Sequence, residues 1–432
     1  MSIEILDTKR KALTINLDGN VFGTFAEIGA GQEVARHFFT AGAAANTVAK
    51  TMSAYDMTFS NEIYGVEESG RYVSKSRLKK MLEYEFQLLQ QRLKTEKYKH
   101  KTFFSFANTV TTINYAKTND PHGWLGIKFQ LAPGGEENQI LFHVRLLDND
   151  STLQQNVLGI LGVNLVYAAF YHYQNPRLMV ESLTDNLAKG SVEIDLISVK
   201  GNAFKGLDDI LANLYLIQKG FSPVAFFGAD GKVYQAKDSM YKKHIMILRT
   251  RFKQKNLPDF GLFEQATDQY KVKKSISDYD LVGVVELTLN NLLNAFPEES
   301  EDFLNSVAQR TKEVLASGYP VIVTNFNRHN KLAKYLSMAK PLSVGITTSI
   351  NNLKNIFLSE HYGEGYTDEL LAYISDLFSR KVRLLVYPFK DSKTKEIFTT
   401  KNLPVSAESK PLYDFLLQNN YIIDVENVSF PD

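Results

Sequence analysis

The sequence predicts an α/β protein in which a small Gly/Ala-rich α+β module precedes two tandem, mostly parallel α/β halves. Short apolar runs typical of buried strands alternate with helical patterns from about residue 190 onward. Hydrophobic residues make up 44% and charged residues 22% of the 432 residues, as in soluble globular proteins. A polar stretch at 269–280 separates two regions with a similar alternation of strand and helix patterns. We therefore expect segments at 1–98, 99–270 and 271–432.

The first segment combines one alternating run with several helical patterns. Residues 11–17 alternate like a strand, and the Gly/Ala-rich region after them favours helices at 32–39 and 43–53. Apolar residues recur at spacings of three and four between 74 and 94, which predicts a long amphipathic helix with Ser74 as its cap.

The next region predicts a strand, a hairpin and an apolar helix. Residues 102–110 form a buried strand in this interpretation, and 124–131 and 140–147 flank a Pro-Gly-Gly turn. The helix at 152–173 contains an apolar run that is shorter than a membrane span and includes Asn164. We expect a buried helix in which the Asn164 amide has partners inside the protein.

The rest of the chain alternates strands with helices. Strands, buried and mostly parallel, are expected near 192–199, 223–228, 244–249, 282–287, 321–325, 342–347 and 382–387. Helices are expected near 207–220, 288–295, 300–317, 328–338, 349–358, 367–380 and 411–419.

Composition limits the function classes. The formal net charge is +1 and there is no Cys, so we expect no nucleic-acid partner, no disulfide and no Cys-ligated metal. No metal-ligand spacing or known catalytic motif is present, so no metal is expected and the cofactor is unknown. An acidic start without an apolar signal segment favours a cytoplasmic protein with no membrane partner.

A glycine-rich turn before a helix is the most suggestive local motif. Gly29 and Gly31 precede the expected helix at 32–39, whose N–H groups suit a phosphate, with Arg36 turned toward it. Glu27 stands two residues before the Gly-x-Gly, which resembles the first loop of S-adenosylmethionine-dependent methyltransferases. The alternative is an ordinary structural turn. Lys50 is either an anion contact or a surface lysine.

Two further groups of polar residues are candidates for ligand binding. His143 and Arg145 share one face of a strand and suit a phosphate or carboxylate, unless they lie on a solvated face with a local ion pair. Asn325, Arg328 and His329 follow an apolar strand. Ligands of open α/β sheets bind beyond the carboxyl ends of the strands, so this group is the best-placed candidate in the second half.

One block of sequence resembles a known family. EIGAGQEVARHFF at 27–39 and TVAKTMSAYDM at 47–57 are similar to the opening of a bacterial protein family of unassigned function. The resemblance implies a bacterial cytoplasmic protein and no particular activity.

Three functional hypotheses follow. The first is binding or turnover of a nucleotide or phosphorylated small metabolite, with the catalytic residues unknown. The second is a non-catalytic assembly or scaffold protein that forms a homo-oligomer, since small residues suit close subunit contacts. The third is a methyltransferase that uses S-adenosylmethionine. Whether the chain is an enzyme stays open at this point.

Overall fold

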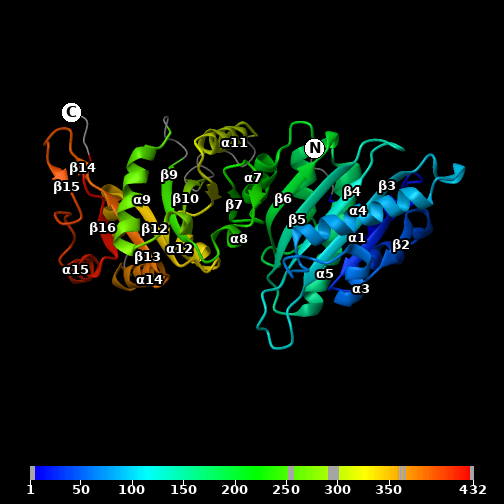
Figure 1. Ribbon diagram of the computed structural model, residues 1–432, viewed down its shortest axis with the longest axis horizontal. Coiled ribbons are helices and arrows are strands. Elements are labelled where there is room, and N and C mark those ends of the chain that lie inside the picture. Colours follow the sequence, from blue (N-terminus) through cyan, green and yellow to red (C-terminus); the bar gives the residue numbers. More distant parts are fainter. Residues whose placement is uncertain are drawn as a thin grey trace. The chain divides into compact units, whose positions relative to one another are not determined.

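The computed structural model describes residues 5–251, 257–289, 301–358, 360, 362 and 366–428. The chain divides into two compact units, Met1–Pro223 (unit 1) and Val224–Asp432 (unit 2), each with its own large sheet (Figure 1). The predicted α/β class is confirmed. The helix expected at 288–295 falls largely outside the described residues.

Unit 1 contains a six-stranded mixed sheet in the order β2-β1-β3-β4-β5-β6. The first three strands in this order are parallel, and the last three join them as an antiparallel meander. The strands are β1 (Val21–Ile28), β2 (Val48–Met52), β3 (Thr102–Thr111), β4 (His122–Phe129), β5 (Asn138–Leu146) and β6 (Val192–Lys200).

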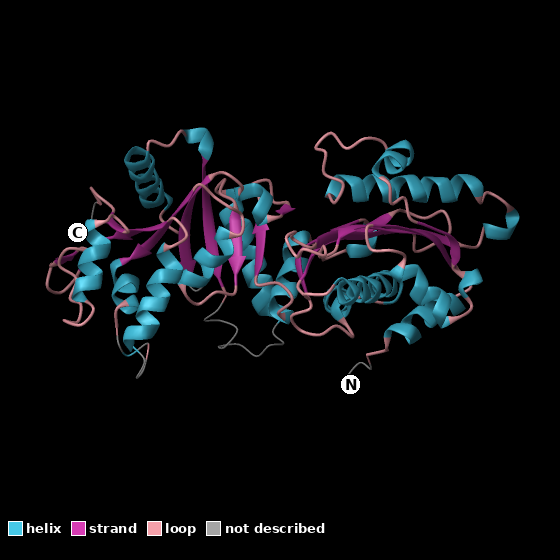
Figure 2. Ribbon diagram, turned by 90° about the horizontal axis from the view of Figure 1, so that it is seen from below, coloured by secondary structure: helices cyan, strands magenta, loops and turns pink. Residues whose placement is uncertain are grey.

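Helices cover both faces of this sheet, as Figure 2 shows edge-on. On one face, Ser105 of β3 donates a hydrogen bond to the Leu82 carbonyl of α4 at 2.9 Å. On the other, the neighbouring Phe106 lies against Gly162 of α5. Successive strand residues point to opposite faces, so α4 and α5 lie on opposite sides. The unit 1 helices are α1 (Thr8–Leu17), α2 (Glu33–Ala41), α3 (Met57–Tyr64), α4 (Lys75–Arg92), α5 (Ser151–Tyr171), α6 (Pro176–Glu181) and α7 (Asp209–Lys219).

The long amphipathic helix and its cap are confirmed. The Ser74 side chain accepts a hydrogen bond from the Arg77 N–H at 3.1 Å and so satisfies one of the free donors at the start of α4. The apolar residues of α4 at spacings of three and four are buried against the sheet.

Two local predictions in the first segment are wrong. Residues 11–17 are helical in α1, where Asp7 caps the first turn and Ala12 and Ile15 are buried at a spacing of three. The helix expected at 43–53 is a short 3-10 turn followed by β2. Pairing with β1 decides the second case, because a five-residue segment beside a sheet edge gains more from the ladder than from its local helix propensity.

The structure also divides the chain at another place than predicted. The expected boundary after residue 98 lies inside unit 1, because β1 pairs in parallel with β3 along eight residues from Val21↔Thr102 to Ile28↔Thr109. The expected boundary after residue 270 lies inside α9 (Phe260–Lys274) of unit 2. Hydrogen bonds between strands distant in sequence join the segments that composition separates.

Helix α5 is the one helix of the described residues that is long and apolar enough to cross a membrane, and two thirds of its most apolar window is buried inside the protein. Asn164, with no exposed surface, lies in its middle. Its amide accepts from Lys11 Nζ at 2.9 Å and donates to the carbonyls of Leu183 (3.1 Å) and Asp185 (2.8 Å). The prediction of internal partners for Asn164 is confirmed.

Replacing Asn164 by leucine should lower the free energy of unfolding by about 1–3 kcal/mol, because three buried polar groups lose a partner. Chemical denaturation monitored by circular dichroism measures this. Asn156→Leu is the matched control, since Asn156 lies on an exposed position of the same helix. Equal stabilities for the two variants would contradict the structural role of the amide.

Unit 2 contains an eight-stranded sheet in the order β16-β13-β12-β9-β10-β11-β7-β8. The first six strands in this order are parallel, and β7 and β8 are antiparallel at one edge. The strands are β7 (Val224–Phe227), β8 (Val233–Tyr234), β9 (His244–Arg251), β10 (Leu281–Thr288), β11 (Val321–Thr324), β12 (Ser343–Ser349), β13 (Val382–Tyr387) and β16 (Ile422–Asp424), with a separate hairpin of β14 (Phe389–Lys390) and β15 (Ile397–Phe398).

The parallel strands follow a known order. Counted along the chain from β9, they lie as 3-2-1-4-5-6, the order of doubly wound dinucleotide-binding sheets. Helices cover both faces of this sheet (Figure 2). They are α8 (Ala236–Met240), α9 (Phe260–Lys274), α11 (Glu301–Ala316), α12 (His329–Ser337), α13 (Ile350–Ile356), α14 (Tyr366–Phe378) and α15 (Lys410–Gln418). The strand expected at 192–199 is β6 of unit 1, which pairs antiparallel with β5. The strand expected at 223–228 is β7, which pairs antiparallel with β11.

Candidate functional site

The start of α2 is occupied by the chain's own carboxylate. Glu27 is 1% exposed and accepts hydrogen bonds from the N–H groups of Val34 (3.1 Å) and Ala35 (2.9 Å) and from Asn108 Nδ2 (3.2 Å). Burial raises the pKa of Glu27 to about 7, against these hydrogen bonds. The prediction of an anion site at the start of α2 is therefore wrong, because the Glu27 carboxylate already binds the N–H groups that an external phosphate would need.

The other residues of this motif have local roles. Gly29 and Gly31 have φ of +101° and +76°, which agrees with the alternative of a structural turn. Arg36 forms an ion pair with Glu33 at 2.7 Å on the surface of α2. Its guanidinium therefore serves a contact within the helix, and Glu27 bonds to backbone instead of facing a cofactor.

Lys50 lies on β2 and pairs with a buried carboxylate. Its Nζ is 2.5 Å from Glu85 Oε2, and Tyr64 donates to the other oxygen of Glu85 at 2.8 Å. Burial raises the pKa of the Tyr64 hydroxyl, so the tyrosine remains a donor. Lys50 is thus the counter-charge of Glu85 and joins β2 to α4.

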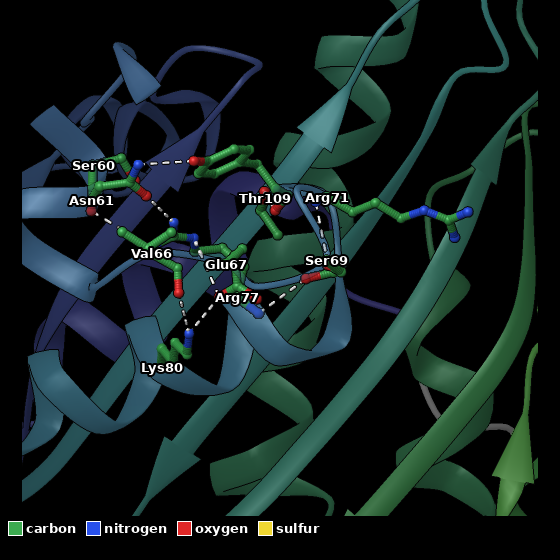
Figure 3. Close-up of polar contacts among 11 residues, drawn as sticks. Ser60, Asn61, Val66, Glu67, Ser69, Arg71, Arg77, Lys80 and Thr109 are labelled. Carbon is green, nitrogen blue, oxygen red and sulfur yellow. Dashed lines mark hydrogen bonds and ion pairs between the residues drawn. The ribbon is translucent and has the colours of Figure 1, made fainter. Parts of the chain in front are cut away.

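A buried arginine connects α3 and α4 (Figure 3). Arg77 is 1% exposed, and its guanidinium contacts Asn61 Oδ1 at 2.8 Å and Glu67 at 3.7 Å. Lys80 pairs with the same Glu67 carboxylate at 3.0 Å. No pattern in the sequence distinguishes this arginine from the surface charges of an amphipathic helix. Its contacts fix the α3–α4 connection.

His143 and Arg145 point from β5 onto the sheet face that carries α4, and each meets a carboxylate of β6. His143 Nδ1 is 2.6 Å from Asp195 Oδ1, and Arg145 Nη1 is 3.0 Å from Glu193 Oε2. His122 of β4 contacts the other ring nitrogen of His143 at 3.0 Å. Arg145 therefore forms the local ion pair of the alternative interpretation. Because Glu193 neutralises the guanidinium, Arg145 is not available as the positive charge of the expected anion site.

An irregularity in strand pairing brings Asp195 into contact with His143. The β5–β6 register shifts between His143 and Val144, and Asp195 is the additional residue of β6 at that point. Such bulges redirect a side chain in a sheet. Regular alternation along β6 would leave Asp195 in step with Glu193 on one face, but the contact with His143 depends on the bulge.

In unit 2, charged and polar groups gather near the carboxyl ends of three neighbouring strands. Arg249 of β9 lies with its Nε 3.3 Å from Glu286 Oε2 of β10, and Thr324 of β11 donates to Glu286 Oε1 at 2.6 Å. Glu286 has no exposed surface, and burial raises its pKa against the opposing effect of Arg249. Arg249 Nη1 is buried and has no hydrogen-bond partner among the described residues.

The same arginine positions the loop that carries the predicted polar residues. Arg249 Nη2 and Thr288 Oγ1 each donate to the Phe326 carbonyl at 2.7 Å. The loop leads into α12, whose N-cap residue Arg328 makes no capping bond with its side chain. Arg328 is exposed and lies 5.6 Å from the ring centroid of Tyr362.

His329 begins α12 and is buried. Burial and the charge of Arg249 lower its pKa well below the usual value, so the ring is neutral at pH 7. Its Nε2 has no hydrogen-bond partner in the part of the chain that the structure describes. We call Arg249, Glu286, Thr324, Arg328 and His329, with the start of α12, the strand-end site.

The strand-end site combines predicted and unexpected residues. Arg328 and His329 were predicted, and the exposed Asn325 lies in the same loop. The sequence analysis did not identify Arg249 and Glu286 as site residues. Each is a charged residue near the end of an apolar strand, and this pattern could have indicated them. The residues predicted near Glu27, Lys50 and His143 belong to three other places in unit 1. Among the described residues, no three His, Cys, Asp or Glu side chains are grouped to hold a metal ion.

The sequence matches no protein-family model and no curated protein. Similar solved structures include the competence/damage-inducible protein CihA from Agrobacterium tumefaciens, with 17% identity, a TM-score of 0.30, and coverage of 39% of this chain and 98% of that chain. Competence-damaged protein (CinA) superfamily proteins from Enterobacter cloacae and Escherichia coli are each 14% identical with a TM-score of 0.27. They cover 39% and 38% of this chain and 98% and 92% of their own. These neighbours are bacterial proteins, and at such scores nothing about activity follows from the likeness.

Proposed function

We propose that unit 2 binds a nucleotide or phosphorylated small metabolite through its phosphate at the strand-end site. The observation that carries the proposal is the start of α12. It follows β11 at the carboxyl edge of the sheet, lacks a side-chain cap, and has Arg328 at its N-cap position. N–H groups at a helix start and a guanidinium are standard ligands of phosphate. The N–H of His329, the first residue of α12, already contacts the Tyr373 hydroxyl, so the next two N–H groups of the helix would take the phosphate.

The carboxyl edge of the parallel sheet supports the same place. In doubly wound sheets, ligands bind outside the carboxyl ends of the strands. Arg249 supplies a buried guanidinium whose Nη1 has no hydrogen-bond partner among the described residues, while its other nitrogens hold Glu286 and the Phe326 carbonyl. One cationic nitrogen therefore remains for an anion, next to the loop that ends at Arg328.

Thermal unfolding in the presence of AMP, ADP, ATP, NAD, inorganic phosphate and S-adenosylmethionine tests the proposal. A ligand at 100 times its dissociation constant should add about 2.7 kcal/mol to the free energy of unfolding. Arg328→Gln should weaken binding about tenfold or more, because a charge-assisted hydrogen bond contributes about 1.5–3 kcal/mol.

Arg383→Gln is the matched control. Arg383 also lies over a tyrosine ring, at 4.2 Å from that of Tyr421, but it belongs to the beginning of β13 at the opposite edge of the sheet. Equal losses in both variants would contradict the strand-end site. A protein that responds to none of the compounds contradicts the proposal and favours the assembly hypothesis. A response to S-adenosylmethionine alone favours the methyltransferase hypothesis.

A further inference from the structure

The two edges of the unit 1 sheet differ in how their backbone groups are satisfied. The sheet ends in β6 on one side and in β2 on the other (Figure 1). Helix α7 covers the outer edge of β6. Asn213 accepts a hydrogen bond from the Ile197 N–H at 3.0 Å and donates one to the Ile197 carbonyl at 2.7 Å. Asp209 accepts from the Val199 N–H at 2.9 Å. These side chains replace the partner strand that a sheet edge lacks.

The outer edge of β2 has no such cover. Among the described residues, β1 is its only neighbouring strand, and no side chain bonds to its backbone on the other edge. Its last three residues, 50–52, pair with β1 in regular register. Lys50, the one charged residue of the strand, does not guard the edge, because its Nζ pairs with Glu85 of α4. The strand therefore presents backbone groups that can accept another strand.

Exposed apolar side chains adjoin this open edge. Four residues connect β2 to α3, and the Tyr64 hydroxyl of α3 lies 3.3 Å from Met52 Sδ of β2. Tyr55, Met57 and Phe59, in and next to the first turn of α3, are 75%, 61% and 61% exposed. Apolar side chains that gather on a surface mark sites of association. We call β2 together with these three side chains the β2 edge.

The charges of this segment favour a second copy of the chain as the partner. Residues 41–55 contain a single charged side chain, that of Lys50, and Glu85 compensates it. Antiparallel pairing of two copies about a two-fold axis at Thr51 places the two threonines opposite each other and Lys50 opposite Met52 of the second copy. Threonine pairs across strands are favourable, and no like charges meet. An axis at Lys50 would instead set two lysines against each other.

The same symmetry brings the apolar side chains of the two copies to one face. A two-fold axis that relates antiparallel edge strands is normal to the sheet, so it leaves each α3 on the face that carries α4. Met57 and Phe59 of both copies then flank the junction of the strands. Each copy contributes the same groups, as an isologous contact requires.

We propose that two copies of the chain associate through the β2 edge, by antiparallel pairing of β2 about Thr51. The pairing joins the two six-stranded sheets into one. Backbone hydrogen bonds between the strands hold the copies together, and association removes the apolar side chains of the β2 edge from water. The inference is independent of ligand binding by unit 2.

Sedimentation velocity of the full chain tests the association. The wild type should sediment as a dimer, with twice the chain mass of 48.9 kDa, at about 10 µM and above. Phe59→Lys should raise the dissociation constant of the dimer about tenfold or more, because it puts a charge into an apolar contact. A wild type that remains monomeric at these concentrations overturns the proposal.

Leu153→Lys is the matched control. Like Phe59, Leu153 is the third residue of a helix, is more than half exposed, and donates its N–H to a capping aspartate. It belongs to α5, on the other face of the sheet, so this variant should dimerise like the wild type. Equal dissociation constants in the two lysine variants overturn the proposal.

Disulfide cross-linking locates the axis. The chain has no cysteine, so a disulfide between copies can come only from an introduced thiol. Opposite residues of antiparallel strands have Cα atoms about 4.5–5.5 Å apart, which a disulfide spans, so Thr51→Cys should form a covalent dimer under mild oxidation. Ser53→Cys is the control, because the pairing sets Ser53 opposite Ala49 and keeps the two thiol positions about 13 Å apart along the strands. Cross-linking of Ser53→Cys as fast as that of Thr51→Cys overturns the pairing about Thr51.

Discussion

Replacing Gly29 by alanine should destabilise unit 1 more than any other single methyl group added in the turn at 28–32. A Cβ at Gly29 would lie 1.9 Å from the Val110 carbonyl oxygen, which is fixed by the backbone of β3. The φ of +101° adds strain for any L side chain. Overpacking costs about 1–3 kcal/mol and an unfavourable positive φ about 1–2 kcal/mol, so a loss of about 2–5 kcal/mol is expected.

Gly31→Ala provides the comparison for this variant. Gly31 has a φ of +76°, but nothing lies within 4 Å of a Cβ built there. Only the conformational strain remains, and the expected loss is about 1–2 kcal/mol. Urea denaturation of both variants measures the difference. If Gly31→Ala proves as damaging as Gly29→Ala, close contact with Val110 is not what requires glycine in this turn.

Replacing Arg249 by methionine should be the most destabilising change in unit 2. The substitution keeps an unbranched chain but removes the charge that faces Glu286, a side chain with no exposed surface. Removal of one partner of a buried ion pair costs about 3–5 kcal/mol, because an uncompensated charge is left in a medium of low polarity. The double variant Arg249→Met/Glu286→Leu should recover most of this loss.

The loss in Arg249→Met should depend on pH. The pKa of Glu286 in the folded protein is raised above its ordinary value of 4.5 by burial, and it rises further without Arg249. A carboxyl with a raised folded pKa favours folding below the unfolded pKa, and that stability is lost as pH rises through the folded pKa. The variant should therefore approach wild-type stability below about pH 4.5 and differ most above neutral pH. A difference independent of pH would contradict an unpaired Glu286 as the cause.

Features that depend on local patterns are predictable from the sequence alone. The periodicity at 74–94 predicted α4 and its Ser74 cap, and the apolar runs predicted the parallel strands of unit 2. The position of Arg328 and His329 after β11 followed from the strand pattern. Each of these features depends on the spacing of apolar residues or on contacts within a single helical turn.

The pairing of distant segments, in contrast, is seen only in the folded protein. Whether Glu27 caps α2 or leaves room for a phosphate depends on the β1–β3 ladder, which brings Asn108 beside it. Alternation in 11–17 fits a strand, but packing of Ala12 and Ile15 in the core favours a helix. Arg249 and Glu286 meet because β9 and β10 are neighbours in the sheet, although the two residues are 37 positions apart along the chain. Such contacts depend on sheet order and register, which local spacing does not encode.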